Sequence, residues 1–211
     1  KTGRGKDKVT IDRGDNHTIE TGPENDNVII ASGINRIMMG EGSDAITVEG
    51  GINTIFLDVG GDIASISGVN NTLSTAEGSD LVNINGGTNS IITSSGNDTI
   101  NVSGGTNHIR TQIDADTITI SGGTNTILTG GGDEIVTMTA GINNLSTGDG
   151  NDTITAAGGA SNVDIRTLDA GDGLDTLRVI STGTVALPTA QNVENIFISD
   201  TIHQSLDFSF S

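Results

Sequence analysis

The chain has 211 residues with 31 Gly, 2 Pro and no Cys, which excludes disulfides and thiol chemistry and, because Pro is scarce, collagen. Its 27 acidic and 9 basic residues give a net charge of −18, which predicts repulsion from nucleic acid and from anionic membranes. No apolar run approaches the roughly 20 residues of a membrane span, so we expect no membrane insertion.

The chain begins with basic residues on an otherwise acidic sequence. Five of the nine basic residues lie within the first 13 positions: Lys1, Arg4, Lys6, Lys8 and Arg13. A basic start can dock on the acidic end of a second copy and build head-to-tail fibres. The alternatives are that these charges protect an exposed strand edge, or that the chain is a fragment of a longer protein.

An 18-residue repeat follows and predicts the fold. Gly-Gly-Thr-Asn begins at Gly86, Gly104 and Gly122. Its Asn extends into a column of seven: Asn35, Asn53, Asn71, Asn89, Asn107, Asn125 and Asn143. Nine residues out of phase runs an acidic column: Asp26, Asp44, Asp62, Asp80, Asp98, Asp116, Glu134 and Asp152. Asp7 precedes this column by 19 residues, and Asp175 follows it after a five-residue insertion.

Apolar residues alternate with other residues after each acidic position, as in Val28/Ile30 and Ile46/Val48. A period of two indicates strands. Each coil therefore holds two short strands and two turns. Two residues after the apolar residue that follows each Asn stands a column of mostly Thr, as in Thr75 and Thr93, which we expect to point inward at the edge of the core. We predict an all-β fold, a right-handed parallel β-roll or β-helix with 18-residue coils. Residues 1–179 would form the solenoid, and residues 180–211 a small β-rich C-terminal cap.

The acidic half of the repeat carries a family resemblance. Gly148-Asp149-Gly150-Asn151-Asp152-Thr153-Ile154 has the pattern Gly-x-Gly-x-Asp-x-apolar, and residues 2 to about 179 follow it. This resembles the RTX family of calcium-binding nonapeptide-repeat proteins, whose turns bind calcium between successive coils of a β-roll. The resemblance implies Ca²⁺ as the cofactor and the acidic column as its ligands: Asp7, Asp26, Asp44, Asp62, Asp80, Asp98, Asp116, Asp152 and Asp175.

Calcium takes oxygen ligands, and stacked carboxylates would repel one another without a cation. The alternative is that each Asp only caps its own turn, with no ion involved. Departures from the family pattern predict incomplete occupancy: Ala76, Ser94 and Gln112 stand at one Gly position, Glu24 and Asp114 at another, and Glu134 replaces the Asp. In the opposite turn Asn replaces Asp, which predicts a column of amides that bond one another and hold no metal.

Outward positions suggest partners. Met38, Phe56, Ile92 and Leu128 fall in one column and form a candidate assembly stripe, although scattered exposed apolar residues are common. Thr117/Thr119 and Thr153/Thr155 resemble the Thr arrays of ice-binding solenoids, although Thr is also a good strand residue.

Beyond Asp175 the pattern becomes irregular. The last residues, Leu206 to Ser211, are similar to uncleaved signals of type I secretion substrates, which implies secretion to a bacterial cell surface.

No catalytic constellation is visible. His17, His108 and His203 are scattered, His17 and His108 are expected at solvated turn or outward positions, and the chain has no Gly-x-Ser-x-Gly. We therefore expect that the protein is not an enzyme. The function predicted is a secreted, self-assembling, calcium-binding structural protein of a surface layer, matrix fibre or adhesin stalk, with a cell-surface polysaccharide as a further candidate partner. The alternatives are a solenoid that binds ice or carbohydrate and a polysaccharide-modifying solenoid enzyme.

Overall fold

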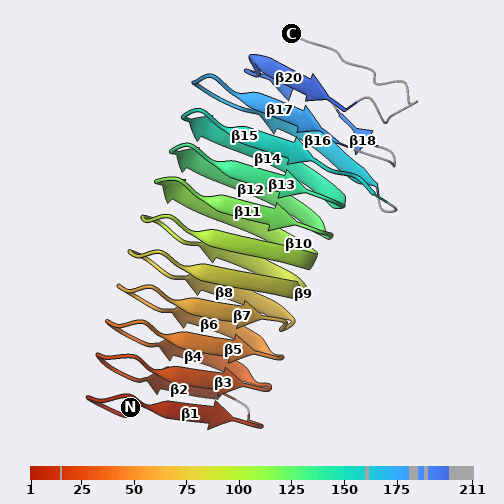
Figure 1. Ribbon diagram of the computed structural model, residues 1–211. Helices are drawn as coiled ribbons and strands as arrows, with labels where there is room; N and C mark the ends of the chain where they lie inside the picture. The colour runs from red at the N-terminus through yellow and green to blue at the C-terminus, as the bar shows by residue number, and fades with distance from the viewer. Residues whose placement is uncertain (15, 160–161, 181–184, 188–189, 200–211) are drawn as a thin grey trace.

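The computed structural model describes residues 1–14, 16–159, 162–180, 185–187 and 190–199. These residues form an all-β solenoid of about 10 parallel turns spaced about 18 residues apart, with no helix in the described ranges (Figure 1). The coils stack in chain order from the N-terminus to the last described strand. The prediction of a parallel solenoid with 18-residue coils is confirmed.

Each coil contributes two strands, as the alternating apolar residues predict. The first series follows the acidic positions: β1 (Lys8–Ile11), β3 (Asn27–Ile30), β5 (Ala45–Val48), β7 (Ile63–Ile66), β11 (Thr117–Ile120), β13 (Ile135–Met138), β15 (Thr153–Ala156), β17 (Thr176–Val179) and β20 (Asn195–Ile198). The second series includes the Asn column: β2 (Asn16–Glu20), β4 (Ile34–Met38), β6 (Ile52–Phe56), β8 (Asn70–Ser74), β12 (Thr124–Gly131), β14 (Gly141–Asp149) and β16 (Val163–Asp169). In β9 (Leu81–Ile92) and β10 (Thr99–Ile113) the two strands of a coil run into one another.

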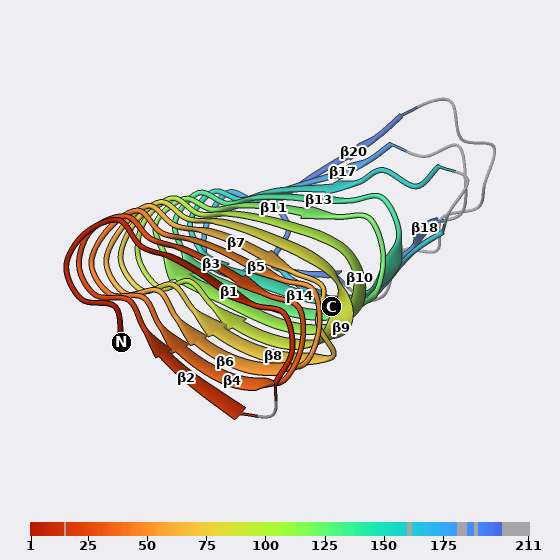
Figure 2. The same ribbon diagram turned by 90° about the horizontal axis from the view of Figure 1, so that it is seen from below.

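The register between coils keeps equivalent residues stacked. Val28 pairs with Ile46, and Asn35 pairs with Asn53, each 18 residues further along the chain. Because side chains alternate between the two faces of a strand, this register keeps the inward residues of successive coils stacked on one another inside the rod. Figure 2 shows the coils closing around a narrow interior. That interior is filled with aliphatic side chains such as Ile30, Ile55 and Ile100, which are fully buried.

The predicted inward Thr column is also confirmed. Its described members are buried next to the acidic turn: Thr21, Thr75, Thr93, Thr111, Thr129 and Thr147. In two coils Met39 and Leu57 take the same position and are buried as well. The core therefore ends in a row of hydroxyl groups where it meets the acidic column.

The coil with the five-residue insertion is irregular. The pairing of β14 with β16 shifts register after Asn143, which pairs with Ile165, whereas Asn144 pairs with Thr167. Arg166 is the extra residue of this bulge. Beyond it, β18 (Val185–Ala186) and β19 (Ala190–Gln191) pair in parallel with β16, and β20 pairs with β17. The predicted boundary at residue 179 stays a prediction, and Leu206 to Ser211 lie outside the described residues.

Candidate cation column

The acidic residues form one buried column along the edge of the rod. Each sits in the turn just before a strand of the first series, so the 18-residue register stacks one carboxyl group per coil. From Asp26 to Asp175 every member, Glu134 included, is at most 3% exposed, and Asp7 is half-buried. All nine Asp residues predicted as metal ligands are thus brought into a single column.

In every Asp of the column from Asp26 to Asp175, one carboxyl oxygen accepts a main-chain hydrogen bond. The amide N–H of Asp44 donates to Oδ1 of Asp62 over 2.8 Å, and the amide of Asp62 donates to Oδ1 of Asp80 over 2.8 Å. The same bond joins six further pairs at 2.7–2.9 Å: Asp7 to Asp26, Asp26 to Asp44, Asp80 to Asp98, Asp98 to Asp116, Glu134 to Asp152 and Asp152 to Asp175. These bonds fix the orientation of each accepting Asp carboxyl group relative to the coil before it.

The second oxygen of each carboxyl group is buried without a hydrogen-bond partner. This holds for Oδ2 throughout the predicted ligand set: Asp7, Asp26, Asp44, Asp62, Asp80, Asp98, Asp116, Asp152 and Asp175. A buried carboxylate oxygen without a donor is costly, so such a group either takes a proton or meets a cation.

The pKa values of the buried Asp residues are raised, which also favours a proton or a cation at these carboxyl groups. Burial raises the pKa of Asp62 to about 7 and those of Asp44 and Asp98 to about 6, from an ordinary value of 3.8. Burial also raises the pKa of Asp80 and Asp116, while the hydroxyl groups of Thr75 and Thr111 beside them oppose the rise. Without a cation, part of the column therefore holds protons close to neutral pH.

The turns add main-chain oxygens around the column. Gly60 and Gly78 precede Asp62 and Asp80 by two residues, and a Cβ at Gly78 would overlap the carbonyl oxygen of Gly60. A Cβ at Gly60 would lie 3.2 Å from Oδ1 of Asp62. Glycine therefore lets successive turns approach one another closely beside the carboxyl groups.

These donors fit Ca²⁺, which prefers carboxylate and carbonyl oxygens. In the described part of the chain no three His, Cys, Asp or Glu side chains converge on one point. A cation in this column would therefore bind the free Oδ2 atoms of the Asp residues together with main-chain carbonyls of adjacent turns. When bound, it would supply the positive charge that keeps the carboxyl groups ionised.

Turns that lack the family glycine keep the same backbone. Asp58, Ala76, Ser94 and Gln112 have φ between 72° and 83°, in the left-handed region that Gly22, Gly40 and Gly148 adopt at equivalent positions. The replacement residues are therefore strained, but they do not remove the turn. Incomplete occupancy at these coils stays a prediction.

Glu194 is a further member of the column that the repeat pattern did not identify. The amide of Asp175 donates to Oε2 of Glu194 over 2.8 Å, so Glu194 extends the column by one coil. Glu194 follows Asp175 by 19 residues, the spacing that also separates Asp7 from Asp26. That spacing could have identified it.

On the opposite side of the rod the predicted amide ladder is confirmed. Nδ2 of each Asn from Asn35 to Asn125 donates to Oδ1 of the Asn in the next coil over 2.8–2.9 Å. Several also donate to the carbonyl three residues earlier, as Asn89 does to Gly86 over 2.8 Å. From Asn53 to Asn143 each Oδ1 accepts such a bond, whereas Oδ1 of Asn35, at the first coil of the ladder, is buried without a partner.

The prediction for His17 is wrong. His17 pairs with Asn35, is half-buried, and occupies the position of the Asn ladder in its coil, with Nε2 unpartnered. The spacing of 18 residues before Asn35 places it there. His108 is exposed, as expected, and His203 lies outside the described residues.

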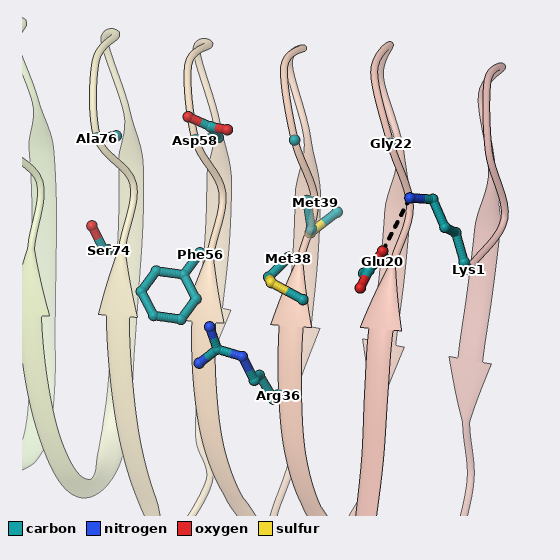
Figure 3. A pocket seen from close by; sticks show the side chains of 11 residues that line it. Lys1, Glu20, Gly22, Arg36, Met38, Met39, Phe56, Asp58, Ser74 and Ala76 are labelled. Atoms are coloured by element: carbon teal, nitrogen blue, oxygen red, sulfur yellow. Dashed lines mark ion pairs between the residues drawn. The ribbon is translucent and has the colours of Figure 1, made fainter.

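Two residues of the candidate assembly stripe line a groove on the outer face of the second strand series. Met38 and Phe56 lie in adjacent coils and border a groove of about 590 Å³ (Figure 3). The Arg36 guanidinium stacks over the Phe56 ring at 4.8 Å, and Lys1 pairs with Glu20 at 3.2 Å. Charged side chains therefore cover part of this apolar stripe.

Comparison with family models found no match, and comparison with curated proteins found none either. Within the described residues, no helix has the length and apolar character needed to cross a membrane.

Proposed function

We propose that this protein is a secreted, calcium-binding structural rod that assembles with copies of itself. The observation that carries the proposal is the column of buried Asp residues from Asp26 to Asp175, each with one oxygen that accepts a main-chain amide and one left without a partner. The resemblance of the turns to the RTX pattern supports calcium as the ion. The same resemblance is the ground for proposing secretion to a bacterial cell surface.

Calcium would act by joining each coil to the next. The aliphatic core is narrow, and each coil buries only a few apolar side chains, so a solenoid of this kind depends on contacts between neighbouring coils. A cation bound by two successive turns removes the repulsion between their carboxylates and adds a crosslink. A rod stiffened in this way suits a surface layer, a matrix fibre or an adhesin stalk.

The test is a calcium titration of protein freed of metal with a chelator, followed by far-UV circular dichroism and light scattering. We expect calcium to raise the unfolding temperature and to increase the scattering as copies associate head-to-tail or side by side. Magnesium at the same concentration is the control, because it prefers smaller octahedral sites. A protein whose stability and scattering are the same in chelator and in calcium would contradict the proposal and leave the Asp residues as turn caps.

A second candidate function has one supporting observation, an uncharged outer face on a strongly acidic protein. Outward positions of the first strand series carry only neutral side chains over six coils: Ile63, Ser65, Leu81, Asn83, Thr99, Asn101, Thr117, Thr119, Ile135, Thr137, Thr153 and Thr155. Such a face suits a neutral, ordered ligand such as ice or an uncharged polysaccharide. Thermal hysteresis and co-sedimentation with insoluble polysaccharide test these two ligands separately.

The hypothesis of a polysaccharide-modifying enzyme is tested by incubating the protein with alginate or pectin. We expect no release of unsaturated uronate products. Their appearance would replace the structural role with a catalytic one.

A further inference from the structure

Glu134 is the one member of the column between Asp7 and Asp175 that is not Asp, and the hydrogen-bond pattern breaks there. The amide of Asp98 donates to Oδ1 of Asp116, and the amide of Glu134 donates to Oδ1 of Asp152. Between them, the amide of Asp116 makes no such bond to Glu134 among the described residues. The extra methylene of Glu134 has carried its carboxyl group out of register with the column.

The carboxyl group of Glu134 has moved toward the core and toward the next coil. Oε2 accepts a hydrogen bond from the buried Thr129 hydroxyl over 3.2 Å, and the carboxyl group also meets that of Asp152. A Cβ on Gly132 would lie 2.6 Å from Oε1, so the carboxyl group fills the space beside this turn glycine. Glu134 as a whole is 1% exposed.

In the coils whose column residue is Asp, the carboxyl group lies further from the turn glycine. A Cβ at Gly60 or Gly173 would lie 3.2 or 3.3 Å from Oδ1 of the Asp two residues later, so those carboxyl groups stay further from the turn backbone. Each of those Asp residues keeps its Oδ2 free of donors, and Oε1 of Glu134 is likewise buried without a partner. The carboxyl group of Glu134 therefore lies closer to the turn backbone than the carboxyl groups of the Asp residues do.

We infer that Glu134 fills a cation position with its own carboxyl group and divides the column into two separate cation-binding segments, Asp7 to Asp116 and Asp152 to Asp175. This inference rests on the proposed binding of calcium. Calcium needs six to eight oxygens from the turns on either side of it, and the shifted Glu134 carboxyl excludes it from the junction between the coils of Glu134 and Asp152. The two segments then fill independently.

The experiment compares the wild-type protein with Glu134→Asp and Glu134→Gln. Calcium stoichiometry is measured by equilibrium dialysis and the binding curve by calorimetry, with calcium chloride as the only ligand. We expect Glu134→Asp to bind at least one more ion per chain than the wild type, and Glu134→Gln, the matched control of equal length, to bind the same number. An unchanged stoichiometry in Glu134→Asp, or the loss of an ion in Glu134→Gln, would overturn the inference.

Hydrogen exchange in chelator separates this inference from the proposed function. We expect the Asp116 amide to exchange faster than the amides of Asp98 and Glu134 in the wild type, and to become protected in Glu134→Asp. If the exchange pattern holds but the wild-type protein binds no calcium, the proposed function fails and the two segments with it. If the wild-type protein binds calcium but the Asp116 amide is as protected as its neighbours, only the role of Glu134 is wrong.

Discussion

The two oxygens of each column carboxyl group have different surroundings, and this difference gives the residue its chemistry. Oδ1 of Asp62 accepts the amide of Asp44, whereas Oδ2 of Asp62 is buried without a donor. An Asp that only capped its turn would be satisfied by hydrogen bonds of the turn itself. The geometry of these Asp residues therefore favours binding of a proton or a cation at Oδ2.

Turn positions that lack glycine hold a strained backbone. Gln112 has φ of 83°, and a Cβ on the equivalent Gly130 of the next coil would overlap the Gln112 carbonyl oxygen. We expect Gln112→Gly to stabilise the protein by about 1 kcal/mol, because a side chain in the left-handed region costs about that much. Urea denaturation measures the change.

Gly130→Ala is the reciprocal control and should destabilise, since it adds both the strain and the overlap with Gln112. A destabilising Gln112→Gly would mean that the side chain of Gln112 makes a favourable contact that outweighs the strain.

At the scale of the element, the strands of the second series depend on the Asn ladder for their register. A strand that slipped by one residue would replace Asn with an outward residue and break two amide bonds at once. Because the amides are buried and bonded on both sides, they select one register in a way that aliphatic side chains alone do not.

Asn89→Ala tests the ladder in the middle of the rod. The substitution removes the donor to Asn107 Oδ1 and the donor to the Gly86 carbonyl, both at 2.8 Å, and leaves buried acceptors unsatisfied. We expect a loss of about 3 kcal/mol in the free energy of unfolding. Asn101→Ala is the matched control, because Asn101 donates to Asn83 on the outer face over 2.9 Å, and its loss should cost well under half as much. Equal effects of the two variants would show that burial of the ladder adds nothing.

At the scale of the whole molecule, the buried carboxyl groups link stability to pH. Their pKa values are raised in the folded protein, to about 7 for Asp62 and about 6 for Asp44 and Asp98, so the folded state binds protons more tightly than the unfolded chain does. This contribution to stability is complete below the unfolded pKa of 3.8 and is lost as the pH rises through 6 to 7.

In chelator we therefore expect the urea midpoint to be higher at pH 5 than at pH 8, and calcium to restore it at pH 8. Asp62→Asn should reduce the difference between the two pH values, because it removes the group with the most raised pKa of the Asp residues that carry a value. Glu49→Gln removes an exposed charge and should leave the difference nearly unchanged. A midpoint that rises with pH in chelator would contradict the assignment.

The repeat spacing predicts the coil, the register, the inward apolar columns and the Asn ladder, because residues 18 apart must stack once the chain closes a coil. Spacing does not reveal how a carboxyl group turns inside the stack, so the unpartnered Oδ2 atoms could not be predicted. The shift at Glu134 depends on one methylene within a packed interior, and the Arg166 bulge depends on how the five-residue insertion is accommodated. The positions of Glu194 in the acidic column and of His17 in the Asn column, by contrast, could have been predicted from the repeat spacing.

The hydrogen bonds in both side-chain columns point the same way along the rod. Asp26 donates to Asp44 and Asn35 donates to Asn53, and in each case the donor belongs to the earlier coil and the acceptor to the later one. A β-sheet has only a small net dipole, but the amides of the Asn ladder are aligned head to tail and add together, with the positive end toward the later coils. The Asn ladder thus gives the rod a dipole along its axis, and for two rods side by side the ladder dipoles interact favourably when the rods lie in opposite directions.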